Sequence, residues 1–143
     1  TSMSETDGRQ FVDTNVLIYA HDVSAGDKHL RAEALIMDLW QSRLGCLSIQ
    51  VLQEFYVNVT KKVARPLTTP VAVQIITDLS TWQIHSPTSA DVLQAIRLQE
   101  RYQLSFWDAM IITSAVRMGC KTVWSEDLNS GQTYDQVMVV NPL

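Results

Sequence analysis

Four acidic side chains, spread along the chain, are the residues best suited to chemistry: Asp13, Glu54, Asp108 and Asp127. Carboxylates gathered in one pocket repel one another, and the neighbouring sequence supplies too few Lys or Arg residues to neutralise them. A hard divalent cation would remove this conflict, because Mg²⁺ prefers oxygen ligands and is usually held by one or two carboxylates together with a substrate phosphate. Hydrolysis of a phosphodiester bond requires a centre of this kind.

Three of these acids also have ordinary structural explanations. Asp13 follows the apolar run 10–12 and precedes polar residues, as a turn or a helix cap does. Ser105 and Asp108 have the spacing of a capping box at a helix start. Asp127 occupies a loop after an apolar segment. Considered one at a time, each of these acids could have a local structural role or could belong to a functional site.

Helical periodicity gives Glu54 two interpretations. In the helix predicted over 49–64, Glu54 shares a stripe with Asn58 and Lys61, nearly opposite the apolar side. Such a stripe faces either solvent or a polar cleft, and the helical wheel does not separate these two environments.

Asp108 lies in a helix, predicted over 105–118, that is apolar almost all round. Thr113, Ser114 and Arg117 mark the polar side of this helix, and Asp108 projects from the opposite side. A carboxylate on a buried face needs a partner, since an unpaired buried charge is costly.

Short apolar segments alternate with helical patterns along the chain. Strands are expected at 10–12, 45–48, 82–85, 121–124 and 137–140, and the other helices at 28–42, 69–79 and 89–101. Thr69 is expected to cap the helix 69–79, with Pro70 at its first position. The pattern predicts a three-layer α/β/α sandwich with a central, mainly parallel sheet. Sites in such sheets form beyond the carboxyl ends of the strands, where Asp13 and Asp127 are expected to lie.

Length and composition narrow the function classes. The 143 residues, 46% of them hydrophobic, suit a single domain over 10–143, preceded by a disordered or tag-derived segment over 1–9. No apolar run approaches the roughly 20 residues that span a bilayer, so a cytoplasmic protein is expected. The two cysteines and three histidines lack metal-ligand spacing. The net charge of −4 argues mildly against binding nucleic acid by bulk electrostatics, although Lys61, Lys62 and Arg65 form a local basic group that is a weak candidate for substrate binding.

Four motifs in order resemble the PIN domain family. They are Phe-Val-Asp-Thr-Asn-Val-Leu at 11–17, Glu54 within 48–55, Ser-Phe-Trp-Asp-Ala at 105–109 and Ser-Glu-Asp-Leu at 125–128. A compact domain of this kind is most similar to VapC-type toxins of toxin–antitoxin pairs. The resemblance implies a metal-dependent endoribonuclease that uses Mg²⁺ or Mn²⁺ to cleave RNA, with frequent homodimers and an inhibitory antitoxin protein as partners.

The resemblance also implies roles for individual residues. It places the catalytic and metal-binding acidic roles on Asp13, Glu54, Asp108 and Asp127. Ser125 falls at the position of a supporting hydroxyl, and Asn15 at that of a polar neighbour. Glu126 stands beside Asp127, so two acids compete for the metal-facing position, and Asp127 is preferred.

Two other function classes remain open. An aspartyl-phosphate enzyme or receiver domain also places an acid after its first strand, but such phosphatases need a second Asp where this chain has Asn15. A catalytically inactive PIN-fold module could instead bind RNA or act as a scaffold. Metal titration discriminates this last class, because a nuclease should be stabilised by Mg²⁺ or Mn²⁺ and an inert module should not.

Overall fold

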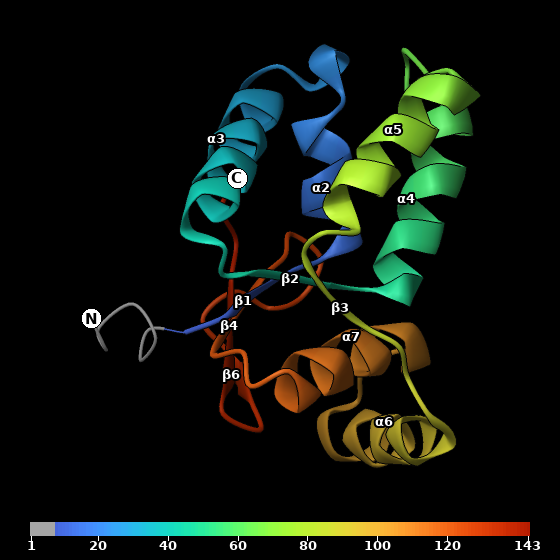
Figure 1. Ribbon diagram of the computed structural model, residues 1–143. Coiled ribbons are helices and arrows are strands. Elements are labelled where there is room, and N and C mark those ends of the chain that lie inside the picture. Colours follow the sequence, from blue (N-terminus) through green and yellow to red (C-terminus); the bar gives the residue numbers. More distant parts are fainter. Residues whose placement is uncertain (1–7) are drawn as a thin grey trace.

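A six-stranded sheet forms the centre of the computed structural model, which describes residues 8–143 (Figure 1). Its strands lie in the order β3 (Gln83–His85), β2 (Gly45–Ser48), β1 (Gln10–Val12), β4 (Thr122–Trp124), β6 (Val137–Val140) and β5 (Thr133–Tyr134). All neighbouring strands are parallel except β5, which runs antiparallel to β6. The carboxyl ends of β1 and β4, which are adjacent strands, therefore meet at the same edge of the sheet.

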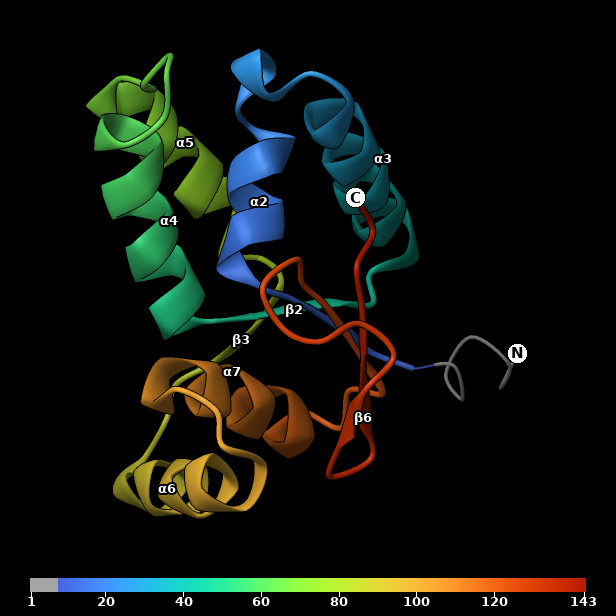
Figure 2. The same cartoon turned by 180° about the vertical axis from the view of Figure 1, so that it is seen from behind.

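Helices cover both faces of the sheet, as the two opposite views show (Figures 1 and 2). One face carries α2 (Thr14–Ala20), α3 (Asp27–Ser42), α4 (Ile49–Lys61) and α5 (Thr69–Leu79), with the short 3-10 helix η1 (Val23–Ala25) after α2. The other face carries α7 (Phe106–Arg117), with α6 (Ser89–Tyr102) packed outside it. This arrangement confirms the predicted α/β/α sandwich.

The core lies on both faces of the central strands. Phe11 and Val12 of β1 are fully buried, as are Val123 of β4 and Val139 of β6. Successive side chains of a strand point to opposite faces, so a sheet covered on both sides requires continuous apolar strands rather than alternating ones. The short apolar runs in the sequence therefore identified the strands.

Two predicted helix ends are wrong by a few residues. The helix expected over 49–64 ends at Lys61, because the chain turns back and the Leu67 amide donates to the Val59 carbonyl over 2.9 Å. Pro66 disfavours a helical conformation just before it, which favours this early turn. The cap of α5 is Thr68 rather than Thr69, and its side chain makes no capping hydrogen bond.

The predicted polar side of α7 is also wrong. Thr113 and Ser114 are buried rather than solvated, and the Ser114 hydroxyl lies 2.8 Å from His85 Nδ1 at the end of β3. Asp91 of α6 accepts a hydrogen bond from Arg117 over 2.7 Å and lies 3.3 Å from His85 Nε2. This network joins α6 and α7 to the sheet, which explains why polar residues occur on a buried helix.

Several expectations concern the whole chain. A disordered or tag-derived segment was expected over 1–9. Residues 1–7 of this segment lie outside the described residues. Within residues 8–143, no helix has both the length and the apolar character needed to cross a membrane. Cys46 and Cys120 are buried free thiols.

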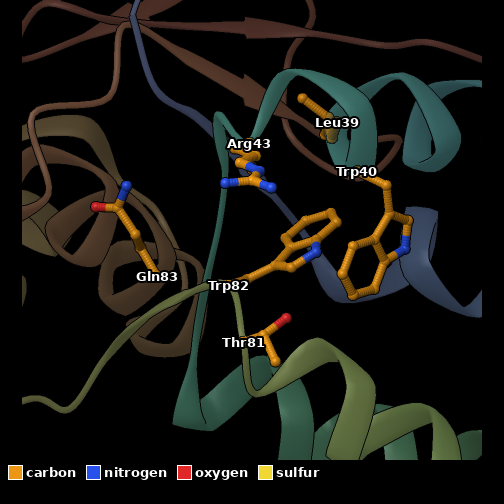
Figure 3. A pocket seen from close by; sticks show the side chains of 7 residues that line it. Leu39, Trp40, Arg43, Thr81, Trp82 and Gln83 are labelled. Atoms are coloured by element: carbon orange, nitrogen blue, oxygen red, sulfur yellow. The ribbon is translucent and has the colours of Figure 1, made fainter.

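Gly45 is needed where Trp82 packs on the backbone of β2, beside a cavity of about 530 Å³ (Figure 3). A Cβ atom at this position would overlap with Cζ3 of Trp82. Moving the indole away from Gly45 would disturb its edge-to-face packing on Trp40, where the ring centroids are 5.3 Å apart. We expect Gly45→Ala to lower the free energy of unfolding by about 1–3 kcal/mol and to change the tryptophan fluorescence.

A Trp82→Ala background provides the matched control for this substitution. Urea unfolding of both single variants and the double variant measures the coupling between the two positions. Gly45→Ala should cost far less once the indole is absent. An equal cost in both backgrounds would show that the close approach to Trp82 is not the cause.

Candidate active site

Asp13 directly follows β1 and is the N-cap of α2. Its Oδ1 accepts a hydrogen bond from the Thr14 amide over 2.7 Å, and its Oδ2 accepts one from the Ser125 hydroxyl over 2.8 Å. Only 5% of the residue is exposed. Burial raises the pKa of Asp13 to about 6; the bonds from Ser125 and Thr14 oppose this rise, and the charges of Asp108 and Asp127 add to it. Asp13 is thus both a helix cap and a member of an acidic cluster.

Asn15 and Ser125 join Asp13 to the loop after β4. Asn15 Nδ2 donates to Asp13 Oδ2 over 3.3 Å and to Asp127 Oδ2 over 3.1 Å. The Ser125 hydroxyl, which donates to Asp13, accepts the Asp127 amide over 3.2 Å. Both residues that the resemblance marked as supporting therefore lie between the two acids.

Glu126 is held away from this cluster by partners on α2 and α3. Its carboxylate accepts hydrogen bonds from Lys28 Nζ and, over 3.1 Å, from the Tyr19 hydroxyl. Lys28 Nζ also lies 5.2 Å from the centre of the Tyr19 ring. Because Glu126 already has a cation partner while Asp127 shares Asn15 with Asp13, the geometry favours Asp127 as the acid of the cluster.

Glu54 is half-buried, and its carboxylate is held by hydrogen bonds from side chains of α2 and α4. The Thr14 hydroxyl donates to Glu54 Oε1 over 2.6 Å, which ties α4 to the start of α2. Gln50, one turn earlier in α4, donates from Nε2 to Glu54 Oε2 over 3.5 Å and to the Trp107 carbonyl over 3.2 Å. Glu54 is therefore not a freely solvated residue of the helical stripe, since its carboxylate contacts Thr14 at the start of α2.

Gln50 is a residue of the site that sequence reasoning missed. Its Nε2 links Glu54 to the residue before Asp108, and its buried Oε1 is the one buried side-chain oxygen or nitrogen without a hydrogen-bond partner among the described residues. Rotating the amide would place Oε1 against two acceptor oxygens, so the observed orientation is favoured. The only sequence signal was its spacing of four residues before Glu54.

Asp108 lies in the first turn of α7, half-buried. Its amide donates to the Ser105 hydroxyl over 3.1 Å, which is one half of the predicted capping box. Burial raises the pKa of the Asp108 carboxyl, and the charges of Asp127 and Glu54 raise it further. The structure thus brings the other three predicted acids, Asp13, Glu54 and Asp127, within electrostatic reach of Asp108.

The cluster fits a hard cation by the chemistry of its donors. All four side chains offer carboxylate oxygens, the ligands that Mg²⁺ and Mn²⁺ prefer. Burial raises the pKa values of Asp13 and Asp108, and the neighbouring carboxylates raise them further. A bound cation would offset both effects, because it stabilises the ionised carboxylates. Among residues 8–143, however, no three His, Cys, Asp or Glu side chains form a ready set of ligands for one ion.

The three basic residues proposed for substrate binding are not equivalent. Lys62, at the end of α4, lines a cavity together with Asn15 and Asp127. Lys61 and Arg65 are exposed and do not line that cavity. Of the three, only Lys62 lies beside the acids in a hollow surface.

Comparison with known proteins supplies the family. The sequence matches the family model of the PIN domain over residues 11–134, which is most of the chain. The chain belongs to the PIN domain family. The resemblance drawn from the four sequence motifs is therefore confirmed. No curated protein matches the sequence significantly.

Solved structures share the PIN domain architecture. One is Mycobacterium tuberculosis VapC20, described as a toxin that cleaves the sarcin–ricin loop; it is 22% identical, with a TM-score of 0.64 over 82% of this chain and 89% of its own. Another is a toxin–antitoxin complex from Klebsiella pneumoniae, in which the matched chain is 20% identical with a TM-score of 0.66, over 94% of this chain and 98% of its own. At these identities the likeness establishes the fold.

Proposed function

We propose that this PIN domain is a metal-dependent endoribonuclease that hydrolyses RNA phosphodiester bonds and acts as the toxin of a toxin–antitoxin pair. One observation carries the proposal: acids from the end of β1, from α4 and from the loop after β4 all lie within electrostatic reach of Asp108 in α7. A convergence of oxygen donors at the carboxyl edge of a parallel sheet suits phosphoryl chemistry. The two toxin-related structures of the same fold support the assignment.

Each acid has a distinct proposed role. Asp13 and Asp108 would hold a divalent cation, Mg²⁺ or Mn²⁺, directly or through water, while Asp127 would hold it through water or place a second ion. When bound, such a cation supplies Lewis-acid polarisation of the phosphate, a more acidic water and stabilisation of the leaving oxygen. Glu54, oriented by Thr14 and Gln50, would accept a proton from the attacking water.

Protein partners form a second part of the proposal. The structure from Klebsiella pneumoniae contains a toxin with its antitoxin, which supports an antitoxin partner here. Exposed apolar side chains on α3 and α5 offer surface for an antitoxin or for a homodimer; they are Leu30, Met37, Val71 and Val73. We also propose a cytoplasmic location, because the RNA substrate of the proposed nuclease would be found there.

Incubation of the purified protein with total RNA tests the proposed function. Mg²⁺ or Mn²⁺ should produce discrete new RNA ends, and EDTA should prevent them; mapping the ends by sequencing identifies the cleaved sites. Unchanged RNA at every metal concentration would contradict the proposal.

A catalytically inactive PIN module is the second candidate. The observation in its favour is that Thr14, Ser125 and Asn15 already provide hydrogen bonds to the acids. Thermal unfolding with Mg²⁺ separates the two candidates, because a nuclease centre should be stabilised and an inert module should not.

A further inference from the structure

A cavity of about 450 Å³ opens beside Asp127, between α2, η1 and the carboxyl end of α4. This volume lies within the range of roughly 300–1,000 Å³ that is typical of small-molecule sites. Ile18, Ala25 and Val63 provide apolar surface, and the polar lining includes Asn15, Asp22, Asn58, Lys62, Glu126 and Asp127. A lining that combines apolar and polar side chains suits a flat, partly polar group.

The charged residues that line the cavity indicate whether it would accept the phosphate or the base of a nucleotide. Three acids and one lysine line the cavity, and although Glu126 is paired with Lys28, two acids still face Lys62, so a phosphate inside the cavity would be repelled. Asp22 accepts both hydrogen bonds from Ser24 through Oδ1, which leaves Oδ2 without a donor among residues 8–143. The cavity therefore offers hydrogen-bond acceptors and favours a ligand that carries donors.

Asn58, in α4, provides one hydrogen-bond acceptor in the lining of the cavity. Its Nδ2 donates to the Glu54 carbonyl over 2.7 Å, which determines the orientation of the amide. Its Oδ1 receives no hydrogen bond from any described residue. Glu54, Asn58 and Lys62 follow one another at intervals of four residues, so they form a line that leads from the acidic cluster to the cavity.

We propose that this cavity is a base-binding subsite that selects the RNA nucleotide next to the cleaved bond. The base carries an amino group, as in adenine, cytosine and guanine, and donates to Asn58 Oδ1. Lys62, exposed at the end of α4, binds the adjoining phosphate. The subsite rests on the proposed nuclease function. Uracil is the disfavoured base, because its one base donor, the ring N3–H, lies between two carbonyl oxygens that the acidic lining would repel.

Cleavage of a randomised single-stranded RNA library tests this subsite. With Mg²⁺, ends produced by the wild-type protein should be depleted of uracil at one fixed position beside the cut. Asn58→Leu keeps the size but removes the acceptor, and it should reduce that preference by about fivefold or more, as expected for one lost base contact. Lys62→Gln should weaken cleavage of all sequences alike.

Gln53→Leu is the matched control, because Gln53 is exposed on the same helix and does not line the cavity. Its base preference should equal that of the wild type. RNA that is cut with the same preference by the wild type and by Asn58→Leu would overturn the subsite and leave the nuclease assignment intact. RNA that is never cut would instead contradict the nuclease assignment.

A direct binding measurement tests the subsite without cleavage. Titration with adenosine and with uridine, followed by NMR, should show adenosine binding at least about fivefold more tightly, and Asn58→Leu should remove this difference. Equal binding of the two nucleosides by the wild-type protein would refute the proposal.

Discussion

Asp13→Asn is expected to lower metal-dependent RNA cleavage by on the order of a thousandfold. Asp13 is the most buried of the clustered acids, and its carboxylate lies where β1, α2 and the loop after β4 meet. Asparagine keeps the shape of the side chain and can still accept the Thr14 amide hydrogen bond through Oδ1, so the helix cap is kept. The substitution removes the negative charge and the acceptor that Oδ2 offers to Ser125 and Asn15.

RNA cleavage and thermal unfolding of the same preparations check this expectation. Asp38→Asn is the matched control, because Asp38 is an exposed acid on α3, away from the cluster. The control should cut RNA as the wild type does, and Asp13→Asn should be folded but nearly inactive. If the Asp13→Asn protein cut RNA at the wild-type rate, Asp13 would have no role in the mechanism.

The sheet and the position of Asp13 could be predicted because they depend on short-range patterns. Apolar runs identified the strands, and the alternation with helices implied parallel pairing. An acid directly after a central parallel strand then had to lie at the edge where such folds place their sites. The antiparallel strand β5 was missed, because its two residues, Thr133 and Tyr134, lie in a polar stretch without a strand pattern.

The environment of the other acids depended on contacts between distant segments. A helical wheel places Glu54 on a face but does not show that Thr14, 40 positions away in sequence, lies opposite it. The choice between Glu126 and Asp127 likewise depended on Lys28, which is 98 positions distant. Ser114 was assigned to the polar side of its helix because its partner His85 lies in β3, far away in sequence. Periodicity within one helix contains none of this information.

The metal-free protein is expected to lose stability as the pH rises from about 4 to about 6 because of Asp13. The pKa of Asp13 is about 6 in the folded protein, against an ordinary value of 3.8. Between these values the folded state keeps a proton that the unfolded state releases, so raising the pH favours unfolding. The pKa difference corresponds to about 3 kcal/mol at pH 7. The raised pKa of Asp108 acts in the same direction.

Urea unfolding in EDTA between pH 4 and pH 7.5, for the wild type and Asp13→Asn, isolates this contribution. Other carboxyl groups titrate in the same range, so the informative quantity is the difference between the two curves. Asp13→Asn should become the more stable protein as the pH passes 6, because its side chain has no charge to desolvate. Mg²⁺ should reduce this advantage above pH 6, since a cation stabilises the ionised cluster of the wild type by ligand linkage. A difference that does not vary with pH would mean that Asp13 ionises in the folded protein as it does in water, and a difference that Mg²⁺ leaves unchanged would mean that the cluster holds no cation.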